Sequence, residues 1–366
     1  MMLKTTLAAA CATLFAASLA TPAFAQVPAG YPADYQKIID GAKKEGKLVV
    51  YGATDSKATQ PLIKDFNALY PGITVEYNDM NSTEVYNRFI SEVAAGGNTA
   101  DAMWSSAMDL QMRLASDGYA LKYKSVEAAK IPGWAVWDDQ AYGTTFEPAA
   151  IVYNKRLVDA KEVPQTHADF AKLIVQPKFK DKVTTYDIEK SGVGFMFMTQ
   201  DAREYPKFLE LENAFGEAKV RVQSSTGTMM ERISSGENLI GYNVLGSYAL
   251  VRAKADPSIG VVLPKDYTLI LSRVLFINKA AKNVNAAKLW LDYMLSHRGQ
   301  TIIANDSKLF AIRADVTGET TSADLIKMIG KDNVKPVPVH PIVLQFLGPA
   351  KRMAFLKQWK ETAGKK

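Results

Sequence analysis

Three groups of small hydroxylated, amide and acidic residues each follow a short apolar stretch in the first third of the chain. Hydroxyl groups at the start of a helix lie beside free backbone N–H groups, and together they favour an anion. One such loop means little, but three in succession predict a single site for a polar ligand. The groups are Thr54, Asp55 and Ser56, then Asn81, Ser82 and Glu84, and then Ser105, Ser106 and Asp109. For any one of these residues, the alternative is that it only caps its helix.

Two loops in the second half of the chain carry the same kind of side chain. Four hydroxyl residues and a glycine occupy positions 224–228, where a helical pattern that ends at Gly236 begins. One hydroxyl suffices to cap a helix, so the surplus indicates hydrogen bonds to a phosphate, a phosphonate or a carboxylate. Ser191 and Gly192, before an apolar helix, give a weaker signal. The alternative is an ordinary capped turn. The residues expected to form the stronger cradle are Ser224, Ser225, Thr226 and Gly227.

These loops need strands and helices that hold them at one edge of a sheet. Residues 48–51 form a continuous apolar run bounded by glycine, which is typical of a strand buried on both faces. A helical pattern and a strand at 73–77 follow, so the segment predicts a βαβ unit with a right-handed crossover. Residues 100–104 predict a third strand. Since ligands bind at the carboxyl ends of strands in open α/β sheets, the polar loops lie where a ligand is expected.

The first 25 residues differ from the rest. Lys4 provides a positive n-region, residues 5–20 form an apolar h-region, and Ala23-Phe24-Ala25 is a cleavage signal. We expect a secretory signal peptide that is removed after Ala25, and therefore a periplasmic protein. The only cysteine, Cys11, would be removed with it, so the mature chain would contain no disulfide.

Composition places the remainder among globular proteins, and its length allows two domains. The chain has 366 residues, 48% of them hydrophobic and 22% charged. The net charge of +6 falls to +5 when the single charge of Lys4 is lost with the leader, which is too small an excess to indicate nucleic-acid binding. No later apolar run reaches the length of a bilayer span. An enzyme is disfavoured because the chain contains neither a G-x-S-x-G nor an H-E-x-x-H pattern, which leaves a secreted hydrolase as a distant alternative.

Five stretches carry a family resemblance: residues 48–56, 66–75 (FNALYPGITV), 100–104 (ADAMW), 285–296 (NAAKLWLDYMLS, followed by Gly299 and Gln300) and 312–316 (IRADV). They resemble the extracellular solute-binding proteins of ABC importers, in the branch that holds ferric-ion, phosphonate, sugar-phosphate and polyamine binders. The resemblance covers nearly all of the mature chain.

The resemblance implies a type II-like periplasmic-binding-protein fold, in which two α/β lobes joined by two crossings close on a ligand in the cleft between them. It implies lobe 1 at 26–146 plus 273–310 and lobe 2 at 147–272 plus 311–366. We expect a monomer that binds a small solute, docks on the permease subunits of an ABC transporter, contacts no nucleic acid and needs no cofactor.

Ferric-ion binders in this branch carry two adjacent tyrosines, and the matching strand here holds Tyr242 followed by Asn243. The next tyrosine is Tyr248. A hard trivalent cation needs several anionic oxygens, and the three histidines have no ligand spacing. We therefore expect no metal site, with Tyr242 and Tyr248 as the ligands of the ferric alternative.

The resulting hypothesis is a receptor for a small anionic organic solute, of the phosphonate or sugar-phosphate type. Thr54 and Ser56, with the cradle at 224–227, would hold the oxyanion. Arg273 would supply charge, and Tyr242 or Trp104 would pack on the solute. The other end of the solute, with hydroxyl or ammonium groups, would face Asn81, Glu84, Ser106, Asp109 and Glu147.

Overall fold

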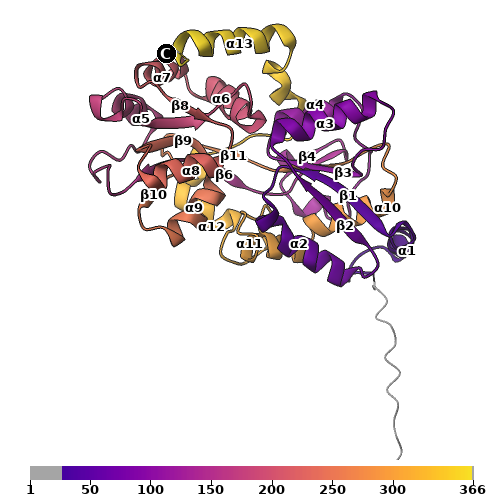
Figure 1. Cartoon of the computed structure of the whole chain (residues 1–366). Helices are drawn as coiled ribbons and strands as arrows, with labels where there is room; N and C mark the ends of the chain where they lie inside the picture. Colours follow the sequence, from indigo (N-terminus) through magenta and orange to yellow (C-terminus); the bar gives the residue numbers. More distant parts are fainter. Residues whose placement is uncertain (1–26, 365–366) are drawn as a thin grey trace, which may run out of the picture.

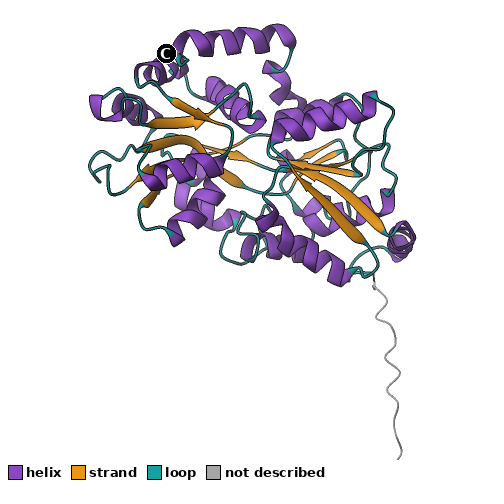
Figure 2. Ribbon diagram, viewed as in Figure 1, coloured by secondary structure: helices purple, strands orange, loops and turns teal. Residues whose placement is uncertain are grey.

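Two α/β lobes form the molecule, each built on one sheet with helices on both of its faces (Figures 1 and 2). The computed structural model describes residues 27–364, so the expected signal peptide at 1–25 lies outside them. The two separate sheets confirm the predicted fold class. Within the described part of the chain, no helix is both long enough and apolar enough to cross a bilayer.

The first sheet joins strands that are far apart in the sequence. β1 lies parallel to both β2 and β3, which confirms the predicted βαβ unit. β12 then lies antiparallel between β3 and β5, so residues 274–277 return to the first lobe as expected. The order of the strands is β2 (Thr74–Asp79), β1 (Lys47–Gly52), β3 (Ala102–Ser105), β12 (Val274–Ile277), β5 (Ala141–Gly143) and β4 (Val136–Trp137).

Three of the helices in this lobe follow the parallel strands β1, β2 and β3. Gly46 ends the first helix in the left-handed conformation (φ 67°), which a glycine adopts without strain. Phe66 and Trp290 pack edge to face in the core, with ring centroids 5.1 Å apart. The helices of this lobe are α1 (Gln36–Glu45), α2 (Ser56–Leu69), α3 (Ser82–Ala94), α4 (Met108–Ser116), α10 (Val284–Leu295) and α11 (His297–Asn305), with short 3₁₀ turns η1 (Ala33–Tyr35), η2 (Ala128–Lys130) and η3 (Gly133–Ala135).

The second sheet is mixed. Its central strand β6 pairs with β9 and β11 in antiparallel fashion, while β7 runs parallel to β8 and β9. The order is β13 (Val334–Pro336), β11 (Thr268–Leu271), β6 (Glu147–Asn154), β9 (Ile240–Leu245), β7 (Val183–Tyr186) and β8 (Arg221–Gln223), and β10 (Ile259–Val262) pairs with β6 beside this path.

Its helices are α5 (His167–Ile174), α6 (Gly192–Glu204), α7 (Phe208–Glu217), α8 (Thr226–Ser235) and α9 (Gly246–Ala255), with 3₁₀ turn η4 (Pro177–Phe179). The chain then continues through α12 (Ser322–Ile329), η5 (Lys331–Asn333) and η6 (Pro341–Phe346) to α13 (Pro349–Thr362), which lies along the outer edge of the second lobe (Figure 1).

The chain passes between the sheets at residues 144–146, after β5, and at residues 272–273, between β11 and β12. The lobe boundaries expected from the sequence stay proposals. The segment after residue 310 contacts both lobes. Leu325 and Ile329 of α12 pack in the apolar cluster around Trp290 of the first lobe, whereas β13 pairs with β11 in the second sheet.

Candidate functional site

A cavity of about 310 Å³ lies between the two lobes. In the first lobe its wall is formed by the loops after β1, β2 and β3, which are the three loops that the sequence singled out. Ligand pockets commonly measure about 300–1,000 Å³, so this one suits a small solute. Its residues from the first lobe are Ala53, Asp55, Asp79, Met80, Asn81, Ser82 and Ser106.

The second lobe contributes the starts of three helices to the opposite wall. Ser191 and Val193 come from the start of α6, and Leu245 and Tyr248 from the start of α9. Tyr186 lies at the end of β7. The expected cradle before α8 also lines the cavity, with Ser224, Ser225, Thr226 and Gly227. The structure therefore brings nine of the predicted residues together, from loops that are distant in sequence: Asp55, Asn81, Ser82, Ser106, Ser191, Ser224, Ser225, Thr226 and Gly227.

Some polar residues of these loops also cap helices. Asn81 Oδ1 accepts the N–H groups of Thr83 and Glu84, each at 3.0 Å, and Glu84 Oε2 accepts the N–H of Asn81 at 3.0 Å. This capping box turns Glu84 toward the start of its own helix, and Glu84 does not line the cavity. Ser191 Oγ caps α6 by accepting the N–H of Gly194 at 3.2 Å.

The start of α8 keeps hydrogen-bond donors for a ligand. Ser225 Oγ accepts the N–H of Thr228 at 3.2 Å, which satisfies one N–H of the first turn. The N–H groups of Thr226 and Gly227 belong to that same turn, where no intrahelical acceptor exists. The Thr226 hydroxyl is hydrogen-bonded to Tyr186 Oη. This end of the cavity therefore combines open N–H groups with the positive end of a helix dipole, which favours an oxyanion.

Ser106 offers a further hydroxyl from the first lobe. Its side chain is buried, with 2% of its surface exposed, and it lines the cavity. Its backbone carbonyl accepts the N–H of Met108 at 3.0 Å. Its hydroxyl has no hydrogen-bond partner among the described residues, so this polar group is open to a ligand.

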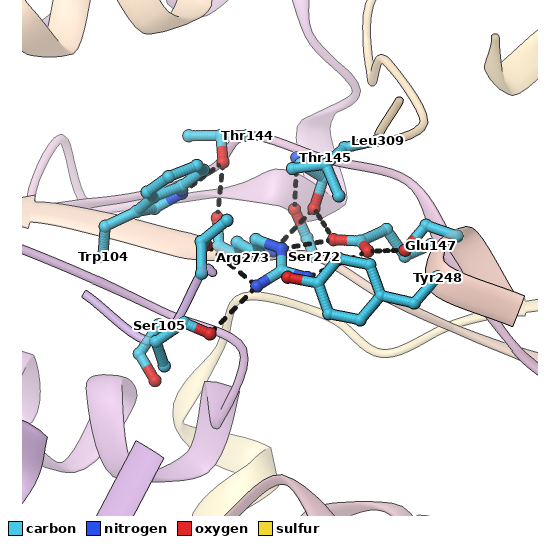
Figure 3. Close-up of polar contacts among 12 residues, drawn as sticks. Trp104, Ser105, Thr144, Thr145, Glu147, Tyr248, Ser272, Arg273 and Leu309 are labelled. Carbon is cyan, nitrogen blue, oxygen red and sulfur yellow. Dashed lines mark hydrogen bonds and ion pairs between the residues drawn. The ribbon is translucent and has the colours of Figure 1, made fainter. Parts of the chain in front are cut away.

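Glu147 and Arg273 do not line the cavity, and they pair with each other (Figure 3). Both side chains are fully buried, and Arg273 Nε is 2.7 Å from Glu147 Oε1. Arg273 Nη1 donates to Thr54 Oγ1 at 2.9 Å and to the carbonyl of Ala53 at 3.2 Å. Burial alone would lower the pKa of Arg273, but the charge of Glu147 raises it above its usual value. The two predicted ligand contacts thus form a structural pair that supports the first loop.

Two hydrogen bonds join the lobes at the cavity. The N–H of Asp55 donates to Tyr248 Oη at 3.3 Å, and the N–H of Val193 donates to Ser82 Oγ at 3.2 Å. Gly192 lies where α6 meets the first lobe, because a Cβ atom there would be 2.7 Å from Leu110 Cδ1. The lobes are therefore in contact around the cavity, as expected of a closed cleft.

Several predicted residues support the wall without lining it. Thr54 is fully buried, and its backbone N–H and carbonyl both bond to Tyr77 Oη, at 3.0 and 2.7 Å. Ser56 donates to Asp79 through its N–H and its hydroxyl. Ser105 Oγ accepts the N–H of Ala107. The indole N–H of Trp104 donates to Thr144 Oγ1 inside the first lobe.

Two further predicted residues lie elsewhere. Tyr242 is buried in the second lobe, where its hydroxyl donates to Asp201 Oδ2 at 3.0 Å. It does not line the cavity that Tyr248 lines, so the two tyrosines of the ferric alternative do not meet at this site. Asp109 is buried beside a neighbouring cavity of about 330 Å³ between the lobes, together with Gly192 and Arg352. Burial raises the pKa of Asp109 to about 7.

Sequence reasoning missed Asp79, Tyr186 and Leu245 as residues of the site. Each is the last residue of its strand, β2, β7 and β9 respectively. Their position at the ends of strands could have identified them, since ligands bind at the carboxyl ends of strands in such sheets. Ala53, Met80 and Val193 were also missed, and they adjoin residues that were predicted.

Comparison with known proteins agrees with a ligand-binding cavity between two lobes. Residues 52–301 match a model of a family described as bacterial extracellular solute-binding protein. A crystal structure of the substrate-binding protein of an ABC transporter from Agrobacterium tumefaciens is 38% identical, covering 87% of this chain and 94% of that one, with a TM-score of 0.82.

More distant solved structures share the fold. The periplasmic binding protein AfuA from Actinobacillus pleuropneumoniae, with exogenous fructose-6-phosphate bound, is 19% identical over 87% of this chain and 98% of that one, with a TM-score of 0.71. Iron-bound HitA from Pseudomonas aeruginosa is 17% identical over 86% of this chain and 99% of that one, with a TM-score of 0.69. At such identities the likeness concerns the fold alone.

Proposed function

We infer the function from one premise: this chain belongs to the family of bacterial extracellular solute-binding proteins. It is the substrate-binding protein of an ABC transporter, and members of this family bind a solute without catalysing a reaction. We propose that the solute is a small organic anion with a phosphate or phosphonate end. The protein would be a monomer that captures it in the periplasm, after removal of the signal peptide, and delivers it to the permease subunits.

The start of α8 is the observation that carries this proposal. Its first-turn N–H groups, the Thr226 hydroxyl and the neighbouring Ser224 converge on a cavity that also receives the open hydroxyl of Ser106. A phosphate or phosphonate group accepts several hydrogen bonds at once, and a helix start provides donors and a favourable dipole for it. The other end of the solute would face Asp55 and Asp79, which accept hydrogen bonds from hydroxyl or ammonium groups.

Native mass spectrometry of the purified mature protein, followed by thermal shift with phosphonates, sugar phosphates, inorganic phosphate and ferric salts, tests the proposal. A ligand that binds only the folded state raises the melting temperature with its concentration. Thr226→Ala is expected to weaken binding of the responding compound about tenfold. Thr228→Ala, two residues further along α8 and outside the cavity wall, is the control and is expected to retain binding. Absence of any shift with phosphorus oxyanions would contradict the proposal.

A ferric ion, or a ferric complex, is the alternative cargo. Phenolate and carboxylate oxygens suit such a hard cation, and Tyr248, Asp55 and Asp79 share the cavity wall. Within residues 27–364, however, no group of three or more His, Cys, Asp or Glu side chains is placed to hold a metal ion. A coloured, iron-bearing protein that ignores phosphorus oxyanions would favour this alternative.

A further inference from the structure

The wall of the cavity has an uneven charge. Of the described residues that line it, Asp55 and Asp79 are carboxylates, and none is a lysine, an arginine or a histidine. Arg273, which does not line the cavity, is already paired with Glu147. Building on the proposed function, we propose that the solute is a zwitterion, with its oxyanion at the start of α8 and an ammonium group at Asp55 and Asp79.

In the first lobe, oxygen atoms of the protein already occupy the helix starts. Asp79 Oδ2 accepts the N–H of Ser56 at 2.7 Å and the hydroxyl of Ser56 at 2.9 Å, at the beginning of α2. Asn81 caps α3 in the same way. An oxyanion of the solute would therefore compete with these groups and be repelled by the Asp79 charge. Asp79 Oδ1 has no partner among the described residues, and it is available to a cation.

Asp55 stands at the N-cap position of α2, where an aspartate usually accepts an N–H from the first turn. Here its side chain makes no cap hydrogen bond, and the residue lines the cavity instead. Burial raises the pKa of Asp55, which Arg273 opposes and the charge of Asp79 reinforces. Two carboxylates that repel each other form a favourable place for an ammonium group, which relieves the repulsion and donates up to three hydrogen bonds.

The second lobe presents the opposite character. α8 is capped by the neutral hydroxyl of Ser225, and the N–H groups of its first turn meet no carboxylate. Ser106 of the first lobe lines the same cavity, and its side chain is 2% exposed and its hydroxyl has no partner among the described residues, which independently indicates a ligand. A solute that spans the cavity would thus meet carboxylates on the first lobe and hydrogen-bond donors on the second. Binding of a zwitterion would satisfy both walls when the lobes close.

Matched pairs of probes that differ only in the ammonium group test this proposal. O-Phosphoethanolamine is compared with propyl phosphate, and 2-aminoethylphosphonate with propylphosphonate, by isothermal titration calorimetry on the full mature chain. The ammonium member of a pair is expected to bind about tenfold more tightly or better, because it gains hydrogen bonds to charged groups. Asp79→Asn is expected to remove this preference. The control is Glu76→Gln, which removes one negative charge from an exposed position of the same strand and is expected to keep it.

The outcomes separate the two proposals. Equal binding within each pair, or tighter binding of the member without the ammonium group, would overturn the zwitterion while leaving an oxyanion receptor in place. A preference that survives in both Asp79→Asn and Asp55→Asn would also overturn it. Failure of all four probes and of inorganic phosphate to bind would overturn the proposed function itself. Loss of the preference in Asp79→Asn, with propylphosphonate affinity retained, would establish the ammonium contact.

Discussion

Glu147 and Arg273 form a buried ion pair that joins the two crossings between the lobes. Glu147 is the first residue of β6, directly after the first crossing, and Arg273 lies in the second. Arg273 also donates to Thr54 Oγ1, so the pair ties both crossings to the first loop of the cavity. The ion pair therefore holds the two crossings together while the lobes close on a solute.

Glu147→Gln is expected to destabilise the fold strongly. It leaves the Arg273 guanidinium buried without a counter-charge, and breaking such a pair costs about 3–5 kcal/mol. Asp138→Asn is the matched control, because Asp138 pairs with Lys122 at the surface, with side chains 48% and 61% exposed. An exposed pair contributes about 0–1 kcal/mol. Urea denaturation measures both, and similar free energies of unfolding for the two variants would show that the buried pair has no special structural role.

Tyr248→Phe is expected to weaken solute binding and to lower the free energy of unfolding by no more than the value of one hydrogen bond. The variant loses the hydrogen bond between the Asp55 N–H and Tyr248 Oη, which links the lobes across the cavity. Such a bond contributes about 0.5–1.5 kcal/mol. Calorimetric titration with the responding solute measures the loss.

Tyr242→Phe provides the contrast. It removes a hydrogen-bond donor from the buried Asp201, so it should lower the free energy of unfolding by about 1–3 kcal/mol and affect binding little. If Tyr248→Phe instead abolished iron binding in a coloured protein, the ferric alternative would replace the organic anion.

Gly192→Ala is expected to oppose closure of the lobes. The added Cβ would be 2.7 Å from Leu110 Cδ1, the end of a flexible side chain, and 3.1 Å from Ala107 Cβ, so Leu110 would have to rotate and the contact between α6 and the first lobe would have to loosen slightly. Small-angle X-ray scattering should show a smaller decrease in the radius of gyration on adding solute, and titration should show weaker binding. Gly133→Ala is the control, since its Cβ would meet no atom within 4 Å. Unchanged compaction in Gly192→Ala would mean that this contact does not limit closure.

The loops of the cavity could be predicted because they follow strands with a distinct apolar pattern. Residues 47–52 form β1 with the expected parallel partners, and the polar groups after β1, β2 and β3 share one wall. The cradle at 224–227 also lines the cavity. Parallel strands place their carboxyl ends at one edge, so sequence order is enough to bring these loops together.

The roles of individual charged residues could not be predicted in the same way. A buried ion pair and a ligand-binding charge look alike in a sequence, because both are charged residues beside apolar strands. Only the fold brings Glu147 and Arg273 together. Likewise, Asp79 and Tyr186 end their strands, and the alternation of a strand does not show which face its last residue takes. Glu84 was expected to face the solute, but it forms a capping box with Asn81, a role that the N-x-x-E spacing itself indicates.

Asp109→Asn is expected to change how stability depends on pH. Burial raises the pKa of Asp109 from near 3.8 to about 7, so between these values the folded state binds more protons than the unfolded state. The contribution of Asp109 to stability is therefore fully present below about pH 4, declines as the pH rises toward 7 and is constant above that.

The amide of asparagine does not titrate, so the variant should gain stability relative to the wild type as the pH rises from 4 to 7. The gain should approach about 1.4 kcal/mol per pH unit in the middle of this range, where the two states of the wild type differ by nearly one bound proton. Urea denaturation at a series of pH values measures this difference, and parallel profiles for the two proteins across that range would show that Asp109 is ionised in the folded state throughout.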